Sequence, residues 1–322
     1  MTTPEGSITA PLPRLFRILL RLNRILVRTG VVTPIARIGS VPVAKRLAIK
    51  PPSWSLPKPS GAVAIEEPVA QGRHGDVPLR TYRPASGGVA PTAVLFVHGG
   101  GFTTGGLDAL DWFCRELAAR GRLAVVSVQY RLAPEHPFPV PLDDVQDALR
   151  WLEAHLESLG AERIAVAGDS AGGNLAAAVC IRSRDEGGPA VAQQILIYPA
   201  LDATHSSPST ADTGASLSSA DIVTSFGHYR GARPADDPEI SPLLAADLSR
   251  LPDALVLIAD HDILRDEGRR YAEALTAAGI AARTVEYPGT DHAFLSLPLV
   301  FTAASQAAVD EVLATLASTA TL

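Results

Sequence analysis

The stretch from Arg163 to Ala178, RIAVAGDSAGGNLAAA, constrains the fold more than any other part of the chain. Its apolar first half is typical of a buried strand, and its alanine-rich second half is typical of a helix. Ser170 lies at the junction in the pattern G-x-S-x-G, between Gly168 and Gly172. A sharp turn there raises the serine hydroxyl above a sheet, and it needs glycines because side chains would crowd it. The strand and the helix together disfavour the alternative, a glycine-rich turn with an ordinary exposed serine.

Strand-like and helix-like segments alternate along most of the chain. We expect two strands between residues 62 and 83, and further strands at 92–97, 123–130, 192–198, 254–259 and 281–287. We expect helices at 108–120, 142–159, 265–278 and 301–317. This alternation predicts an α/β fold with a mostly parallel sheet covered by helices on both faces. A chain of 322 residues, 47% of them hydrophobic, is large enough for one such domain.

Two segments lie outside this alternation. Residues 202–233 are rich in Ser, Thr, Asp and Gly, and we interpret them as a cap or lid insertion over the carboxyl edge of the sheet. Residues 1–55 are predicted to be N-terminal cap helices and a linker, with Pro51 to Pro59 as a stiff connection. The catalytic domain would then be 56–322.

Residues 11 to about 30 form an amphipathic pattern. One face carries arginines and another carries leucines: Arg14, Arg17, Arg21, Arg24, Arg28, and Leu15, Leu19, Leu22, Leu26. Pro13 suits the start of this helix and Gly30 its end. We favour a cap helix packed on the enzyme with solvated arginines. The alternative is peripheral contact of residues 12–28 with an anionic membrane surface, which the absence of acidic residues from Arg14 through Lys50 leaves open.

Charge and composition exclude several classes of function. The net charge of −6 argues against a nucleic-acid partner. There is no G-x-G-x-x-G pattern and no phosphate-binding Gly-Lys-Ser/Thr loop, so no nucleotide cofactor is expected. Cys114 and Cys180 lie in apolar sequence and suggest buried, reduced thiols rather than a metal site. With no spanning segment and no signal peptide, we expect a cytoplasmic protein, with membrane association left open.

Ser170 needs a base and an orienting carboxylate before its hydroxyl can attack a carbonyl. Two loops that follow predicted strands supply them, and their order in the chain is Ser, Asp, His. His292 in the later loop is the candidate base, because His261 lies in the loop that carries the acids. Three aspartates of that earlier loop are candidates for the acid, and spacing does not decide among them: Asp260, Asp262 and Asp266.

The sequence His98-Gly99-Gly100-Gly101 follows another predicted strand. Acyl transfer develops a negatively charged oxygen that requires fixed N–H donors, and consecutive glycines let the backbone approach it. One donor is expected on this loop and another on Ala171, the residue after the serine. A plain strand-to-helix turn is the weaker interpretation.

Five segments of this chain resemble one known family, the hormone-sensitive-lipase-like group of α/β-hydrolase carboxylesterases. They are HGGGF at 98–102, YRLAPEHPFPVPLDD at 130–144, GDSAGGNLA at 168–176, DILRDEG at 262–268 and DHAF at 291–294. They occur in the family's order, and the resemblance runs from about Gly75 to the end of the chain.

The resemblance implies the α/β-hydrolase fold, a catalytic triad of Ser170, Asp262 and His292, and hydrolysis of short- to medium-chain esters without a cofactor or metal. It selects Asp262 among the three aspartates, although Ile263 stands where the family usually has proline. The remaining site residues that it implies are the oxyanion donors Gly100, Gly101 and Ala171, the substrate-binding residue Phe102, and the loop-bracing residues His98, Asp144, Asp169 and Glu267.

Two rival functions and the oligomeric state complete these expectations. A small-molecule receptor on the same fold is disfavoured because His292, which such relatives lack, is present. A membrane-surface lipase depends on the arginine-rich helix. Members of the family often form homodimers through edge strands or the last helices. The resemblance therefore makes a homodimer one option for this chain, and the sequence does not decide its oligomeric state.

Overall fold

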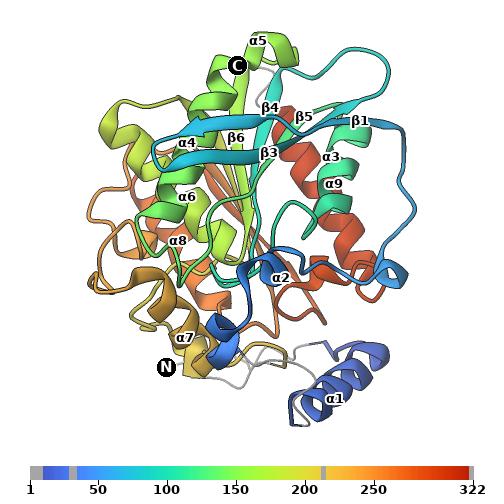
Figure 1. Cartoon of the computed structure of the whole chain (residues 1–322), viewed down its shortest axis with the longest axis vertical. Coiled ribbons are helices and arrows are strands. Elements are labelled where there is room, and N and C mark those ends of the chain that lie inside the picture. The colour runs from blue at the N-terminus through green and yellow to red at the C-terminus, as the bar shows by residue number, and fades with distance from the viewer. Residues whose placement is uncertain (1–9, 29–34, 212–214, 319–322) are drawn as a thin grey trace, which may run out of the picture.

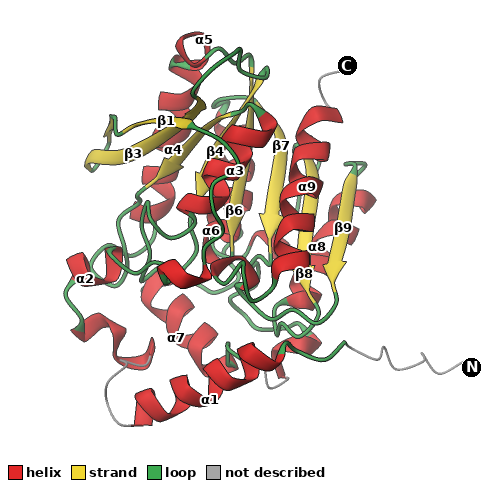
Figure 2. Cartoon of the chain, turned by 90° about the vertical axis from the view of Figure 1, so that its right-hand side faces the viewer, coloured by secondary structure: helices red, strands yellow, loops and turns green. Residues whose placement is uncertain are grey.

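A twisted sheet forms the centre of the computed structural model, which describes residues 10–28, 35–211 and 215–318 (Figures 1 and 2). Within these residues nine strands form one sheet in the order β1-β3-β5-β4-β6-β7-β8-β9, with β2 beside β3. The strands are β1 (Val63–Glu66), β2 (Val69–Gly72), β3 (Gly75–Pro84), β4 (Thr92–Val97), β5 (Ala124–Val128), β6 (Arg163–Asp169), β7 (Val191–Ile197), β8 (Asp253–Ala259) and β9 (Ala282–Tyr287). Neighbouring strands from β5 to β9 in this order pair in parallel, and the antiparallel pairs are those of β3 with β1, β2 and β5. The predicted mostly parallel sheet is confirmed.

Helices cover both faces of this sheet. Helices α3 (Asp111–Gly121) and α9 (Thr302–Ser318) lie on one face, and α4 (Val140–Ala154), α6 (Ala171–Glu186) and α8 (Arg265–Ala277) lie on the other (Figures 1 and 2). Each face has its own cluster of buried apolar side chains. Every residue of β4 is buried, as expected for a strand with helices on both sides.

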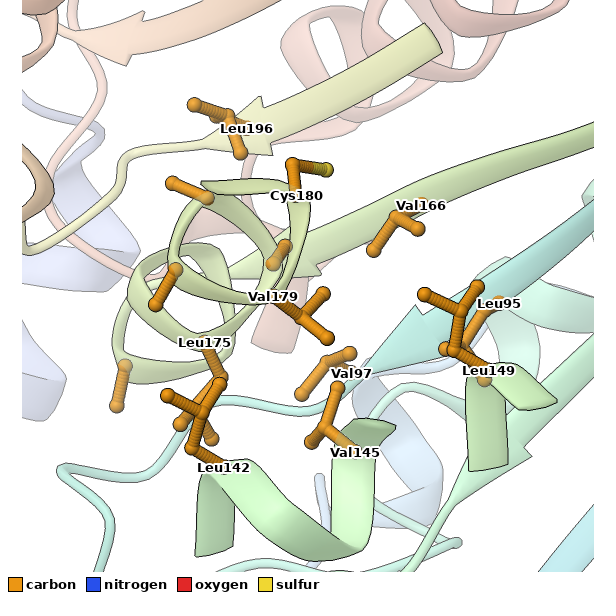
Figure 3. Close-up of a cluster of buried hydrophobic side chains, with 14 of the residues drawn as sticks. Leu95, Val97, Leu142, Val145, Leu149, Val166, Leu175, Val179, Cys180 and Leu196 are labelled. Carbon is orange, nitrogen blue, oxygen red and sulfur yellow. The ribbon is translucent and has the colours of Figure 1, made fainter. Parts of the chain in front are cut away.

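The cluster between α4, α6 and the sheet fixes the helix that follows Ser170 (Figure 3). Leu142 and Val145 of α4 pack near Leu175 and Val179 of α6, beside Val97 of β4. Alanines 176–178 on α6 are fully buried, and their small side chains let the helix lie close to the sheet. The position of the start of α6 is therefore set by core packing.

The strand register brings distant loops together at the carboxyl edge of the sheet. Val97 at the end of β4 pairs with Gly168 near the end of β6, so the glycine-rich loop and Ser170 emerge side by side. Ala259 at the end of β8 pairs with Tyr287 at the end of β9, so the loops carrying the aspartates and His292 also emerge side by side.

Several boundaries differ from those predicted. The two strands expected between residues 62 and 83 are three, because Pro68, which has no N–H to donate, separates β1 from β2 and both pair with β3. The helix expected at 142–159 begins at Val140 and is interrupted at His155, after which α5 (Leu156–Leu159) follows. Cys114 and Cys180 are both buried free thiols, as expected.

Helices outside the main layers gather where the parallel strands end (Figures 1 and 2). They are α1 (Arg14–Arg28), α2 (Val43–Leu47) and α7 (Ser219–Arg230), together with the 3-10 helix η1 (Ile35–Ser40). Short 3-10 helices also occur at Ser53–Ser55, Pro208–Ala211, Pro242–Leu244 and Phe294–Ser296. A capping box between Ser218 and Asp221 starts α7 inside the predicted insertion 202–233, of which residues 212–214 lie outside the described part.

The helix predicted near the N-terminus is present as α1, but its leucine face does not pack on the enzyme. Phe16 is buried and meets the ring of Phe301 edge-on, with 4.8 Å between ring centroids. Of the four leucines predicted to share that face, Leu15, Leu22 and Leu26 are exposed and Leu19 is half-buried. The predicted end at Gly30, residues 1–9 and the side chains of Arg24 and Arg28 lie outside the description. Among the described residues, no helix combines the length and apolarity that crossing a bilayer requires.

Candidate active site

Ser170 lies in a backbone conformation that few residues other than glycine adopt. Its φ is 54° and its ψ is −117°, directly between β6 and α6. A Cβ added to Gly168 would lie 2.2 Å from the carbonyl oxygen of Gly172, and one added to Gly172 would lie 2.0 Å from that of Val97. A side chain at either position would therefore crowd the turn, and glycine allows the strand, the turn and the helix to lie in close contact.

The structure brings together three of the predicted residues. The Oγ of Ser170 is 2.8 Å from Nε2 of His292, and Nδ1 of His292 is 2.6 Å from Oδ2 of Asp262. Because a carboxylate only accepts, Nδ1 carries the ring proton and Nε2 accepts from the serine hydroxyl. The other Asp262 oxygen accepts from the amide of Leu264, at 2.9 Å, which holds the carboxylate in place.

The other two candidate acids are engaged elsewhere. Asp260 accepts from the amides of Gly289 and Thr290 and so shapes the loop that precedes His292. Asp266 accepts from the amide of Ser209 and pairs with Arg269. Of the three aspartates left open by spacing, only Asp262 reaches the histidine.

The surroundings of His292 favour its protonated form. Burial lowers the pKa of His292, but the negative charge of Asp262 and the hydrogen bond to it outweigh burial and raise that pKa above its ordinary value. The ring of Tyr198 meets the imidazole edge-on, with 5.1 Å between ring centroids. The imidazole is thus held between a carboxylate, a hydroxyl and an aromatic ring.

The glycine-rich loop presents backbone N–H groups beside Ser170. Gly100 and Gly101 both have positive φ, and the carbonyl of Gly100 turns back to accept from the amides of Thr103 and Thr104. In the described part of the chain, the N–H groups of Gly100 and Gly101 donate to no acceptor. Ala171 is the first residue of α6, so its N–H has no partner within the helix. All three residues line the same pocket as Ser170.

Buried polar side chains hold the glycine-rich loop in place. Asp169 accepts from the amide of Gly99 at 2.7 Å, and its burial raises its pKa to about 6. Burial lowers the pKa of His98 to about 4, so its ring is neutral at pH 7 and donates from Nδ1 to the carbonyl of Gly99. The hydroxyl of Tyr130 donates to the carbonyl of His98 at 2.9 Å. Neither His98 nor Asp169 approaches the Ser170 hydroxyl within hydrogen-bond distance.

The other two residues expected to brace loops also make backbone contacts. Asp144 accepts from the amide of Arg131 at 2.8 Å. Glu267 accepts from the amides of Leu201 and Asp202, and burial raises its pKa well above the ordinary value. Asn174, which sequence analysis did not single out, donates to the carbonyls of Ala200 and Ile240 and ties the start of α6 to the neighbouring loops.

A mainly apolar pocket of about 410 Å³ opens at Ser170 and His292. Phe102 lines it and stacks on Tyr229, with ring centroids 4.0 Å apart. The predicted insertion contributes Leu217, Ile222 and Phe226 to the wall. The segment from Ile49 to Pro52, which the sequence suggested was partly linker, forms another part of the wall.

Arg46 is a second residue that sequence analysis missed. Its side chain is fully buried and donates to the carbonyls of Val41, Thr103 and Ala133, and it pairs with Glu135. It thereby joins α2 to the glycine-rich loop and to the proline-rich loop at 131–141. Its only sequence signal was a basic residue within an acid-free segment, which does not distinguish a buried arginine from a solvated one.

Comparisons with known proteins identify the family of this chain. A family profile described as the alpha/beta hydrolase fold matches residues 94–296. The carboxylic ester hydrolase LipN of Mycobacterium tuberculosis is 41% identical over 268 residues, which are 79% of this chain and 70% of that protein. The chain belongs to the hormone-sensitive-lipase-like family of α/β-hydrolases. It is a hydrolase, and its relatives are named as carboxylic ester hydrolases.

Other relatives of this hydrolase are also named for ester hydrolysis. The ethyl acetate hydrolase of Pseudomonas putida is 39% identical over 243 residues, 72% of this chain and 76% of that protein. The structure of an ester hydrolase from the metagenome of Lake Arreo, in complex with a derivative of bipyridine phosphonate, has a TM-score of 0.84 at 39% identity. It covers 95% of this chain and 98% of its own. An esterase of Pyrobaculum calidifontis has a TM-score of 0.79 at 36% identity, with 97% and 100% covered.

Proposed function

We propose that this hydrolase is a serine carboxylesterase that cleaves short- to medium-chain esters through an acyl-enzyme. The observation that carries the proposal is the 2.8 Å contact between the Ser170 hydroxyl and a histidine whose other nitrogen is held by Asp262. A serine hydroxyl becomes nucleophilic when a neutral imidazole can take its proton. A receptor on the same fold would need no such contact, and for that reason we favour catalysis.

The first half-reaction transfers the acyl group to the enzyme. The Oγ of Ser170 attacks the ester carbonyl carbon while its proton passes to Nε2 of His292. The tetrahedral intermediate then collapses, its bond to the alkoxy oxygen breaks, and the alkoxide leaves as alcohol with the proton from Nε2. Asp262 keeps its negative charge throughout and stabilises the imidazolium that forms.

The second half-reaction regenerates the enzyme. His292 removes a proton from water, whose oxygen attacks the acyl carbon. The second tetrahedral intermediate collapses, the bond to Oγ breaks, and Oγ takes the proton back from Nε2 as the acid departs. In both halves the carbonyl oxygen becomes negative, and we assign its stabilisation to the N–H groups of Gly100, Gly101 and Ala171. The positive end of the α6 dipole acts in the same direction.

The pocket supports apolar substrates of modest size. A volume of about 410 Å³ lies toward the small end of ligand pockets, which are ~300–1,000 Å³. Phe102, Ile222 and Phe226 in its wall favour an alkyl or aryl group over a charged one. We infer that residues 1–55 and 202–233 act as the cap that closes this pocket over the substrate.

Pre-steady-state hydrolysis of 4-nitrophenyl esters tests the proposal. We expect a burst of one nitrophenolate per enzyme, followed by slower turnover limited by hydrolysis of the acyl-enzyme. Ser170→Ala should lower kcat by about 10⁴-fold or more and abolish the burst. Across acyl chains of graded length, kcat/KM should be highest for the short and medium ones. Near-normal hydrolysis by the Ser170→Ala variant would exclude Ser170 as the nucleophile.

A further inference from the structure

An apolar stripe along α1 faces solvent. It consists of Leu15, Ile18, Leu22 and Leu26, whose exposed fractions are 48%, 45%, 51% and 39%. Among the described residues these are four of only ten large hydrophobic side chains that are exposed. They lie three and four residues apart, so they share one side of the helix along three turns. We call these four residues the leucine stripe.

The leucine stripe is not the side of α1 that is buried against the described body of the enzyme. The contact is made from another side of the helix, where Phe16 is buried against Phe301. An amphipathic helix that only covered the body would turn its aliphatic side inward. Here an aromatic residue anchors the helix and the aliphatic stripe is left facing outward, where contiguous apolar surface marks an interaction site.

The surface beside the leucine stripe is strongly basic. Arg14, Arg17 and Arg21 are exposed on the adjoining side of α1, and within the described residues they pair with no carboxylate. No acidic residue occurs in the sequence between Glu5 and Glu66. The whole chain has a net charge of −6, so this basic character is a property of one face and not of the protein.

We propose that α1 docks the enzyme onto an anionic lipid bilayer. The 15-residue helix, about 22 Å long, would lie in the plane of the interface. The leucine stripe would enter the boundary between headgroups and acyl chains, and the three arginines would meet lipid phosphates. A second copy of the chain fits this surface less well, because two α1 helices paired through their leucine stripes would offer no carboxylate to the arginines beside the stripes.

The residues just before α1 contact loops of the candidate active site. The imidazole Nε2 of His261 donates to the carbonyl of Ala10 at 2.7 Å. A Cβ on Gly289, three residues before His292, would lie 3.2 Å from the carbonyl of Pro11. Figures 1 and 2 place α1 at the same end of the molecule as α7, which helps to wall the pocket. A docked enzyme therefore holds its active-site end toward the bilayer, and the binding itself requires no catalysis.

Sedimentation with lipid vesicles tests the proposal directly. We expect the full chain to bind vesicles of phosphatidylcholine with 30% phosphatidylglycerol at low salt, and to bind pure phosphatidylcholine far less. The triple variant Arg14→Gln, Arg17→Gln, Arg21→Gln should bind the anionic vesicles on the order of 100-fold more weakly. A control with the same change in net charge, Arg120→Gln, Arg150→Gln, Arg283→Gln, alters exposed arginines at the opposite edge of the sheet and should bind normally.

A second pair of variants tests the contribution of the leucine stripe to vesicle binding. Leu22→Gln should weaken vesicle binding severalfold, whereas Val69→Gln on β2, with a similar exposed fraction of 46%, should not. All variants should keep the far-ultraviolet circular dichroism spectrum of the native chain, which shows that they are folded.

Three results would overturn the proposal. One is a native chain that does not bind anionic vesicles, and another is equal binding by the α1 variants and their controls. The third is a native dimer that Leu22→Gln converts to monomers without any vesicle binding, because that result would assign the leucine stripe to a second copy of the chain.

Discussion

Replacing Ser170 with glycine should stabilise the fold relative to replacing it with alanine. Both variants lack the hydroxyl and its contact with His292, so the comparison isolates the backbone. Alanine retains a Cβ at φ 54° and ψ −117°, a conformation whose strain costs about 1–3 kcal/mol in a non-glycine residue. Glycine adopts it freely, but it gives the unfolded chain extra entropy worth about 0.4–1 kcal/mol. The difference should be about 1 kcal/mol in favour of Ser170→Gly.

Urea titrations of the two variants measure this difference as a free energy of unfolding. A control pair of alanine and glycine at residue 307, exposed and inside α9, should show the opposite sign. There Ala307→Gly should lose about 1 kcal/mol, because glycine is a poor helix former. If Ser170→Gly is instead less stable than Ser170→Ala, by the same free energy that Ala307→Gly loses relative to the native chain, then the backbone at residue 170 is not strained. That result would refute the reasoning.

Further predictions concern the acid, the glycine-rich loop and the buried arginine. Asp262→Asn should lower kcat by about 10⁴-fold. It should also move the acidic limb of the kcat/KM–pH profile to lower pH, because His292 works as a base only when neutral and the Asp262 charge raises its pKa; an unmoved limb would contradict this. Gly100→Ala would place a Cβ 2.2 Å from the carbonyl of Thr104 and should lower kcat/KM by about 10²-fold or more in ester assays. Arg46→Met leaves several buried acceptors without a donor and should cost at least about 3 kcal/mol of unfolding free energy in urea, whereas a loss below about 1 kcal/mol would contradict the bracing role.

The central architecture followed from local patterns. Apolar runs such as residues 92–97 predicted strands buried on both faces, and the strand–turn–helix pattern predicted the conformation of Ser170. These features depend on residues close together in the sequence, where steric and burial arguments are strong. The same arguments did not predict that β1 and β2 are separate strands. Pro68 separates them, and whether a proline interrupts a strand depends on how the segments on either side of it pair, here both with β3.

Local patterns did not predict which aspartate is the acid of the triad or which side of α1 packs on the enzyme. Asp260, Asp262 and Asp266 occur within seven residues, and which one faces His292 depends on the loop's path; resemblance alone selected Asp262. Periodicity showed which residues of α1 share a side, but not which side meets the enzyme. That choice depends on Phe301, which is about 280 residues away in sequence. The buried role of Arg46 likewise arises only from carbonyls of distant loops.

The function assigned to Ser170 is tested most directly by trapping it. A 4-nitrophenyl alkylphosphonate should react with the enzyme as Oγ bonds to phosphorus and nitrophenolate leaves. Peptide mapping by mass spectrometry should then find one phosphonyl group per chain, on Ser170, and none in the Ser170→Ala variant. A stable adduct on any other residue, or equal labelling of that variant while ester hydrolysis is lost, would contradict the account.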